Sequence, residues 1–304
     1  MSSTISKQPK SAIYLIDASI YIFRAYFSLP DSWTASNGYS TNAVYGYTLF
    51  LLDLLERTKG DPIAAAFDES LGTCFRNEIY DDYKANRAPP DEELAFQLTI
   101  CRKVTEILGI NTFACERFEA DDYLGSLAQR VKRSTKPIVF VTRDKDIAQL
   151  LRKQDFIWDY AANQWSNSDD IVEQFGVKPD QLVDYLALVG DPVDYVPGVP
   201  GVGKKTAVHL LNHFSSINHI YLALDQVSSL PIRGAKGIQQ RLMDNASQVE
   251  MSQKLTKIKT NIDLDIGVKD LKPQPIDEGF VLAFFDELGF GSRFKTRFKR
   301  FLES

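Results

Sequence analysis

Cysteine is scarce in this sequence and is not arranged for pairing. The 304 residues contain three, Cys74, Cys101 and Cys115, widely spaced and without a Cys-x-x-Cys motif. This excludes a disulfide framework and a cysteine zinc site, and a reducing compartment is the default. No apolar run approaches the ~18 residues of a membrane span. The first apolar stretch stops at Asp17, too soon for a signal peptide. We expect a cytoplasmic protein with no membrane partner.

The chain also lacks the excess of basic residues that is typical of nucleic-acid-binding proteins. Its 35 Lys and Arg against 40 Asp and Glu give a net charge of −5, which by itself argues against a nucleic-acid partner. Nine of the acids, however, fall in motifs that we interpret below as one site, and the remaining 31 acids would leave a net charge of +4. Acids gathered in one cleft, with basic residues elsewhere, fit a metal-dependent enzyme that acts on phosphates.

Length and hydrophobic periodicity predict about two domains. Apolar runs predict strands at residues 12–16, 62–67, 110–115 and 137–142, and helical periodicity predicts helices at 44–55, 92–108 and 119–131. Strands that alternate with helices form mostly parallel sheets, so we expect an α/β domain over residues 11–174. Residues 156–167 are predicted to form a hairpin or irregular link. Residues 175–304 are expected to form an α-helical domain, with no strand up to about residue 262.

Each of three predicted strands runs into an acid, namely Asp17, Asp68 or Asp144. A single Asp after a strand is commonly explained as a turn or helix-cap residue. Three acids at the carboxyl ends of parallel strands are harder to explain in this way, because ligands gather at that edge of such a sheet. The joint pattern favours a site.

Further acids occur in three short clusters. They are Glu119, Asp121 and Asp122 at a predicted helix start, Asp144 and Asp146 after a strand, and Asp191 and Asp194 in a Gly-Asp-Pro-Val-Asp segment. Acids in a first helical turn also complement the helix dipole, but this accounts less well for three of them. Many carboxylates in one cleft repel one another unless divalent cations neutralise them. An all-carboxylate set without histidine fits Mg²⁺ or Mn²⁺.

A glycine-rich loop follows the last acidic cluster. Gly198, Gly201 and Gly203 precede Lys204 and Lys205. A P-loop would require Ser or Thr where Lys205 stands and a strand before the loop, so an NTPase is disfavoured. A helix–hairpin–helix, whose backbone N–H groups hold a DNA phosphate without reading bases, fits better. An ordinary glycine-rich helix connection remains the alternative.

Short motifs run through the chain in a fixed order. They are Tyr14-Leu-Ile-Asp-Ala-Ser19, Phe23-Arg-Ala-Tyr26, Ala66-Phe-Asp68, Phe75-Arg-Asn-Glu78, Tyr83-Lys-Ala-Asn-Arg87, Glu119-Ala-Asp-Asp122, Thr142-Arg-Asp-Lys-Asp146, Gly190-Asp191 and Lys205-Thr-Ala207. In this order they resemble those of the 5′ nucleases, which include the 5′–3′ exonuclease domain of bacterial DNA polymerase I and the flap endonucleases. The resemblance covers about residues 12–210. It implies a PIN-like nuclease core and a C-terminal helical domain with a helix–hairpin–helix at residues 190–211.

The resemblance also implies a role for each matching residue. It assigns a first Mg²⁺ site to Asp17, Asp68, Glu119 and Asp121, and a second site with its outer shell to Asp122, Asp144, Asp146, Asp191 and Asp194. Mn²⁺ would be able to replace Mg²⁺, and K⁺ is a candidate ion at the hairpin. Residues 69–93 would form an arch over the active site through which a 5′ strand passes, and Lys84 would meet the scissile phosphate with Arg87 beside it.

We expect DNA with a 5′ single-stranded end or flap to be the partner of a monomeric protein. The expected DNA-contacting residues are Arg24, Arg76, Tyr83, Lys84, Arg87, Gly198, Gly201, Gly203, Lys204 and Lys205. Within the arch, Phe75, Tyr80 and Tyr83 would offer rings for base stacking, among cations for phosphates. A basic helix is expected before Pro89.

The chain departs from the family pattern at a few positions. Tyr195 replaces the usual Asn, Arg143 replaces a common Gly, and Ala18 stands where Gly is usual. None of these changes removes an acid. Phe residues spaced by four and three in residues 290–301 predict a packing helix with solvated basic residues, in preference to a DNA-contacting tail.

The sequence therefore predicts a Mg²⁺-dependent 5′–3′ exonuclease and flap endonuclease. A non-catalytic DNA-junction binder that keeps the fold is the alternative. The full set of acids argues against it, because a pure binder gains nothing from negative charge near phosphates.

Overall fold

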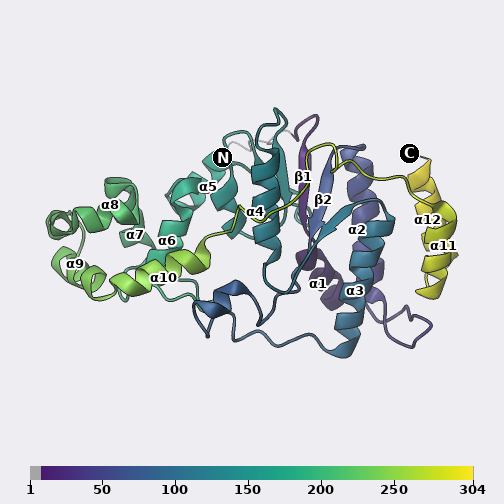
Figure 1. The fold of residues 1–304 in the computed structure, drawn as a ribbon, viewed down its shortest axis with the longest axis horizontal. Coiled ribbons are helices and arrows are strands. Elements are labelled where there is room, and N and C mark those ends of the chain that lie inside the picture. The colour runs from purple at the N-terminus through teal and green to yellow at the C-terminus, as the bar shows by residue number, and fades with distance from the viewer. Residues whose placement is uncertain (1–7, 304) are drawn as a thin grey trace.

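The computed structural model describes residues 8–303, which form an α/β core with helical additions at both ends (Figure 1). The strands are β1 (Ile13–Asp17), β2 (Ile63–Ala66), β3 (Asn111–Phe113), β4 (Ile138–Val141), β5 (Phe156–Asp159) and β6 (Gln164–Ser166). They form one sheet in the order β3-β2-β1-β4-β5-β6. All neighbours pair in parallel except β5 and β6, which are antiparallel. The predicted strands and the hairpin at residues 156–167 are thus confirmed.

The core helices are α1 (Ala18–Ser28), α2 (Asn42–Thr58), α3 (Glu92–Ile107) and α4 (Ala120–Val131). Alternate side chains of β1 face opposite layers. Ile13 and Leu15 pack in the cluster that contains α4, whereas Tyr14 and Ile16 pack in the cluster that contains α1, α2 and α3. Every residue of β1 is buried, as expected of a parallel strand that is covered on both faces.

The remaining helices follow the last strand in the chain. They are α5 (Ser168–Phe175), α6 (Leu182–Val189), α7 (Lys204–Phe214), α8 (Ile217–Leu222), α9 (Ala235–Asp244), α10 (Ala246–Thr256), α11 (Glu278–Glu287) and α12 (Ser292–Leu302). Short 3₁₀ turns occupy Phe75–Glu78, Asp146–Leu150, Pro179–Gln181 and Leu224–Ser229. Figure 1 shows α6 to α10 in green at one end and α11 and α12 in yellow at the other.

The last part of the predicted helical domain, residues 175–304, packs on the α/β core and not with α6 to α10. After α10 the chain runs back along α4, where Ile262 N–H donates to Ser126 Oγ at 3.1 Å. It then passes β2, where Ile63 N–H donates to Leu271 O at 2.7 Å. Phe285, Phe294 and their neighbours are buried in the same cluster as α2. The aromatic face predicted for the last helix therefore belongs to the α/β core, which confirms its packing role.

The arch segment also differs from its prediction. Residues 69–91 contain a 3₁₀ turn at Phe75–Glu78 and further turns, but no α-helix. They run along the lower edge of the sheet in Figure 1, from the region of α10 to the start of α3. Lys84 has a positive φ of 54°, which an α-helix does not accommodate. The expected basic helix before Pro89 is therefore absent from the described residues.

Candidate metal centre and nucleic-acid interface

The carboxyl ends of β1, β2 and β4 bring the predicted acids to one edge of the sheet. Asp17 is the last residue of β1. Asp68 follows β2, and its Oδ1 accepts the backbone N–H of Ala120, the first residue of α4, at 2.7 Å. Thr142, after β4, donates its hydroxyl to Asp17 Oδ2 at 3.0 Å. These contacts tie three strand ends and the start of α4 together, as expected of an α/β sheet whose site lies at this edge.

The other acids line a small cavity at the same edge. It is lined by Glu119 and Asp121 at the start of α4, by Asp144 and Asp146 after β4, and by Asp191 and Asp194 from the helical domain. Asp146 N–H donates to Asp144 Oδ1 at 2.8 Å, which fixes the turn between them. Eight of the nine predicted acids therefore lie together, although 174 residues separate Asp17 from Asp191 in the chain.

Burial and mutual repulsion make this edge unfavourable for negative charge. Burial raises the pKa of Asp17 well above its usual range, and Asp68 and Asp144 raise it further. Burial likewise raises the pKa of Asp121, with Asp144 as the next cause. The pKa of Asp146 rises to about 8, first through burial and then through Asp144 and other acids. A cation at this edge would relieve the repulsion.

The donor set fits a hard divalent cation. All the candidate ligands are carboxylate oxygens, which Mg²⁺ and Mn²⁺ prefer. Asp17 Oδ1 is buried and has no hydrogen-bond partner among the described residues, and an orphaned buried oxygen calls for a ligand. No three acids within residues 8–303 converge closely enough to enclose an ion as they stand. The Lys84 ammonium instead lies between Glu119 and Asp194.

Glu119 is held by three side chains of the arch. Lys84 Nζ donates to its Oε1, whereas Arg76 and Tyr83 donate to its Oε2 at 2.7 and 3.0 Å. Burial alone would raise the pKa of Glu119, but the charges of Lys84 and Arg76 outweigh it and lower the pKa. Lys84 is also attached by its backbone, because its N–H donates to Asp194 O at 3.1 Å. The arch therefore closes onto the acidic edge.

Arg76, which the sequence analysis assigned to DNA, and Asp122, which it assigned to the metal, form a buried ion pair with each other. Arg76 is only 2% exposed, and it donates to both oxygens of Asp122 at 2.7 and 2.8 Å. It also donates to the carbonyls of Leu255 and Lys257 at the end of α10. Asp122, which is fully buried, further accepts the N–H of Lys259. Protein partners therefore occupy both groups in this structure, whereas the contact of Arg76 with DNA and the service of Asp122 to the second metal site or its outer shell stay predictions.

Tyr83 is not available for base stacking either. Its ring is 5% exposed and packs against Val196 and Leu255, and its hydroxyl donates to Glu119. Beside it, a groove of about 800 Å³ follows the arch from Leu71 to Pro89, and Lys84 and Arg87 lie in its wall. Arg87 is half-exposed and forms an ion pair with Asp194. The arch thus offers cations along a groove, with Tyr83 as a buried support.

The hairpin between α6 and α7 has the expected form. Gly190 and Gly198 approach so closely that a Cβ on Gly198 would lie 2.5 Å from Gly190 N, so no side chain fits there. Lys204 begins α7, whose first N–H groups have no intrahelical acceptor. The exposed residues of this turn include Pro200, Gly201, Gly203, Lys204 and Lys205. It presents backbone donors and two cations outward.

Helix α1 adds exposed aromatic residues that the sequence reasoning missed. Arg24 is exposed, as predicted for a DNA contact, and Phe23 and Phe27 flank it with 38% and 79% of their surface exposed. Four-residue spacing of aromatics in a helix that is buried on its other face was the available signal. Tyr195, a departure from the family pattern, has a positive φ of 57°, a conformation that favours the Asn it replaces.

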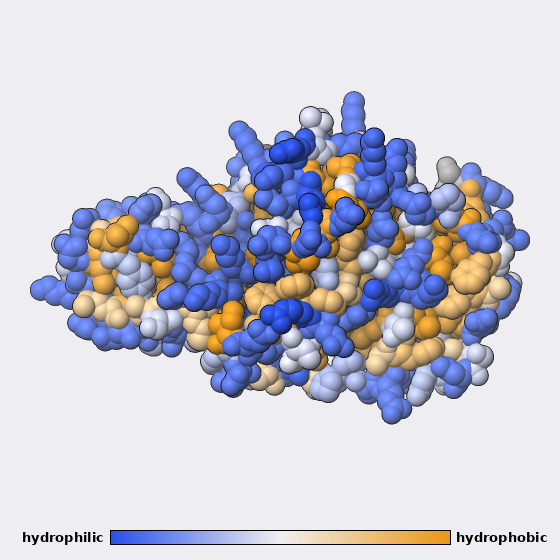
Figure 2. Space-filling view, viewed as in Figure 1, coloured by the Kyte–Doolittle hydropathy of each residue, from blue (hydrophilic) through white to orange (hydrophobic). Residues whose placement is uncertain are grey.

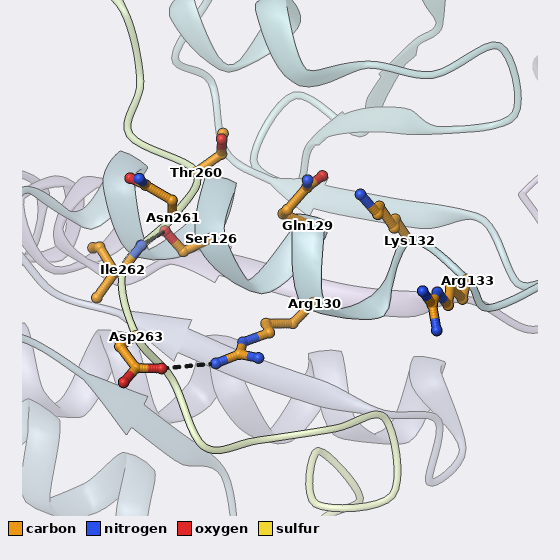
Figure 3. A pocket seen from close by; sticks show the side chains of 9 residues that line it. All are labelled: Ser126, Gln129, Arg130, Lys132, Arg133, Thr260, Asn261, Ile262 and Asp263. Carbon is orange, nitrogen blue, oxygen red and sulfur yellow. Dashed lines mark hydrogen bonds and ion pairs between the residues drawn. The ribbon is translucent and has the colours of Figure 1, made fainter.

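A second pocket lies away from the acids. Figure 3 shows it between α4 and the returning segment, with Arg130 turned toward Asp263 at 3.0 Å. Arg130, Lys132 and Arg133 line it, and none of the acids of the candidate metal centre does.

The face of the molecule in Figure 2 is largely hydrophilic, with only scattered apolar areas. No helix in the part of the chain that the structure describes could cross a membrane.

Comparison with known proteins identifies the family. The profile described as the N-terminal resolvase-like domain of 5′-3′ exonuclease matches residues 12–176, and the profile of its C-terminal SAM fold matches residues 177–279. The chain belongs to the 5′–3′ exonuclease family. This makes it a hydrolase of nucleic acids. The two profiles meet between residues 176 and 177.

Relatives of two lengths match this chain. A 5′-3′ exonuclease of Buchnera aphidicola subsp. Acyrthosiphon pisum is 35% identical over 85% of this chain and 90% of its own length. A DNA polymerase I of Pseudomonas aeruginosa is 38% identical over 92% of this chain, but the match spans only 31% of that polymerase.

Among solved structures, T5 5′-exonuclease with bound zinc has a TM-score of 0.66 at 19% identity, covering 82% of this chain and 90% of its own. The catalytic core of Rad2 with a DNA substrate has a TM-score of 0.61 at 15% identity, covering 92% and 88%. These two structures show the shared fold.

Proposed function

We propose that this chain is a divalent-metal-dependent 5′–3′ exonuclease and 5′ flap endonuclease that hydrolyses DNA phosphodiesters. The observation that carries the proposal is the convergence of acids from β1, β2, the start of α4, the end of β4 and the helical domain on one edge beneath an arch lysine. Named relatives support it, because they include 5′-3′ exonucleases and the T5 D15 flap endonuclease in complex with DNA and metal ions.

The acids divide into two groups along the edge. Asp17, Asp68, Glu119 and Asp121 would hold one Mg²⁺, and Asp144, Asp146, Asp191 and Asp194 would hold a second or orient its water shell. Two such ions would supply an activated water and would stabilise the leaving oxygen of the phosphodiester. Mn²⁺ offers the same ligand preference and would replace Mg²⁺. Asp122 holds the start of α4 in place through Arg76, and its service to the second metal site or its outer shell stays a prediction.

Lys84 and Arg87 would bind the scissile phosphate. Although burial opposes the charge of Lys84, Glu119 and other neighbours raise its pKa well above the usual range, so it stays protonated. A protonated amine is no general base, and we assign Lys84 to electrostatic stabilisation of the phosphate in the transition state. It must leave Glu119 to do so. Its strained left-handed backbone is typical of residues held for function.

DNA would reach the site along two surfaces. The 5′ single strand would follow the arch groove past Arg87, and the duplex would rest on the hairpin, whose backbone donors and lysines grip phosphate without reading bases. Arg24, with Phe23 and Phe27, would contact a DNA strand that passes over the exposed face of α1. We expect a monomer to suffice, because all these groups come from one chain. K⁺ at the hairpin is a further proposal, which DNA affinity in KCl against LiCl would test.

Cleavage of a 5′-labelled flap duplex tests the proposal. With Mg²⁺ or Mn²⁺ we expect labelled products whose length marks a cut at the junction, and shorter products from a recessed 5′ end. EDTA should abolish both reactions. A flap closed by a bulky group at its 5′ end should be cut more slowly if the strand threads beneath the arch.

Two results would contradict the proposal. Full activity in EDTA would remove the metal from the reaction. Tight flap binding without cleavage under Mg²⁺ and Mn²⁺ would make the chain a non-catalytic junction binder, and tight ATP binding lost on Lys204→Ala would point to the P-loop interpretation. The Arg133→Ala variant, which changes an exposed cation outside the acidic edge, should cleave at the wild-type rate and serves as the control.

A further inference from the structure

Arg241 of α9 lies against Gly201 of the hairpin. A Cβ built on Gly201 would lie 3.2 Å from Arg241 Cζ and 3.3 Å from its Nε. A Cβ on Gly237, one helical turn before Arg241, would lie 3.8 Å from Nη2. The guanidinium therefore rests between a glycine of the hairpin and a glycine of its own helix. Gly201 also has a positive φ of 76°, so this approach is built into the turn.

The Arg241 guanidinium forms no hydrogen bond or ion pair with any residue in the range 8–303. Its Nε is buried and has no hydrogen-bond acceptor among the described residues. Asp244, three residues further along α9, accepts from Gln240 and forms no ion pair with Arg241. Arg241 as a whole is half-buried. An arginine offers five donors and no acceptor, and leaving its buried Nε–H without an acceptor is costly. Such a group calls for an anionic ligand.

The hairpin is oriented so that an anion could meet Arg241 there. Helix α10 holds the inner side of the loop, because Gln248 and Ser252 donate to the carbonyls of Gly198 and Pro197 at 2.7 and 2.5 Å. Gly201, Gly203, Lys204 and Lys205 are exposed, whereas Val202 between them is buried. The guanidinium lies against Gly201, three residues before Lys204, where α7 begins and its first N–H groups have no intrahelical acceptor.

We propose that Arg241 binds a phosphodiester of the duplex at the hairpin, as a cation supplied by a separate helix. This rests on the proposed function for its substrate. The two hairpin lysines are mobile point charges, whereas a guanidinium fixed between two glycines presents its donors in one direction and suits a phosphate oxygen pair. The helical domain would thus hold the backbone of the duplex with α7 and α9 together.

Equilibrium binding of a fluorescent flap duplex in EDTA tests this role apart from cleavage. Arg241→Met should weaken affinity about tenfold and reduce the slope of log affinity against log salt by about 0.9, one phosphate contact. Arg241→Lys keeps the charge and should keep most of the slope. Arg133→Met, the same change at an exposed arginine outside the hairpin, should alter neither quantity.

Three outcomes would overturn the inference. Unchanged affinity and slope for Arg241→Met would show that the guanidinium meets no phosphate. A second outcome is an affinity loss with an unchanged salt slope, together with faster hydrogen exchange at the Val199 and Val202 amides that close the hairpin. It would show that Arg241 stabilises the hairpin and does not contact the phosphate. If the wild-type chain binds no duplex, the proposed function falls as well. If the Arg241→Met variant binds and cleaves the flap as well as the wild type does, only this inference is lost and the proposed function stands.

Discussion

The acidic edge of the sheet and the hairpin of the helical domain differ in burial, in charge and in the atoms that they offer a nucleic acid. The edge gathers buried carboxylates that raise one another's pKa. The hairpin exposes glycine backbone and lysines, and the structure brings Arg241 against it. Chemistry on a phosphodiester needs strong, fixed charge in a small space, whereas grip on a regular backbone needs contacts that ignore sequence. Changes at the edge should therefore alter rate, and changes at the hairpin should alter affinity.

The largest expected effect is on turnover at the edge. Asp146→Ala removes a carboxylate from the second group of acids, and loss of several kcal/mol of charge stabilisation corresponds to about 10³-fold in rate. Single-turnover cleavage of a flap should fall by that order while affinity in EDTA changes little. Asp225→Ala, at an exposed acid of the helical domain, should have no effect on either. An Asp146→Ala variant with the wild-type rate would contradict the assignment.

Substitution of Lys84 should have the next largest effect on the cleavage rate. Removing one electrostatic donor to the transition state typically costs about 10²–10³ in rate, so Lys84→Ala should slow single-turnover cleavage by that factor. Lys84→Arg should recover only part, since the two cations differ in shape and reach. Equal losses in rate and affinity would make Lys84 a simple phosphate contact, and Lys153→Ala, at an exposed lysine elsewhere, provides the matched control.

Arg76 distinguishes a structural cation from a DNA-contacting one. Arg76→Met leaves Glu119 and Asp122 without their buried partner, and breaking such a pair typically costs about 3–5 kcal/mol of unfolding free energy. Urea denaturation should show this loss. If the variant keeps full stability but binds DNA less tightly, the assignment of Arg76 to DNA would be supported.

The raised pKa values at the edge predict a pH effect on stability. An acid whose pKa is higher in the folded chain binds more protons there, so its contribution is lost as the pH rises. For Asp146, the window extends from 3.8 to about 8. Without metal, the unfolding free energy should fall as the pH rises through this window, and Mg²⁺ should oppose the fall. Asp146→Asn should flatten the dependence, whereas a rising free energy over the window would contradict the burial argument.

The smallest effect is expected at the hairpin lysines. Lys204→Ala combined with Lys205→Ala removes two phosphate contacts, so the slope of log affinity against log salt should shrink by about 2. The loss should be similar for unrelated duplex sequences. Gly203→Val adds bulk in open space, and it is a cleaner probe of close approach than Gly201→Val, which the positive φ and Arg241 would strain. A sequence-selective loss would contradict backbone recognition.

The sequence predicted the parts of the site that depend on chain direction, and it missed those that depend on distant packing. Asp17, Asp68 and Asp144 end parallel strands, so topology alone brings them together. Whether Arg76 faces DNA or protein depends on α10, whose Leu255 carbonyl lies 179 residues further along the chain. The aromatic spacing of α12 showed that one face is buried, but nothing local specified that α2 covers it.

Counting bound ions tests the central claim most directly, namely that these acids form one divalent-metal centre. Mn²⁺ titration followed by electron paramagnetic resonance gives the number of ions per chain without any reaction. Wild-type protein should bind two ions, and Asp146→Ala should bind one of them much more weakly. Asp225→Ala should match the wild type. No bound Mn²⁺ at millimolar concentration, or two ions held unchanged by Asp146→Ala, would contradict the account.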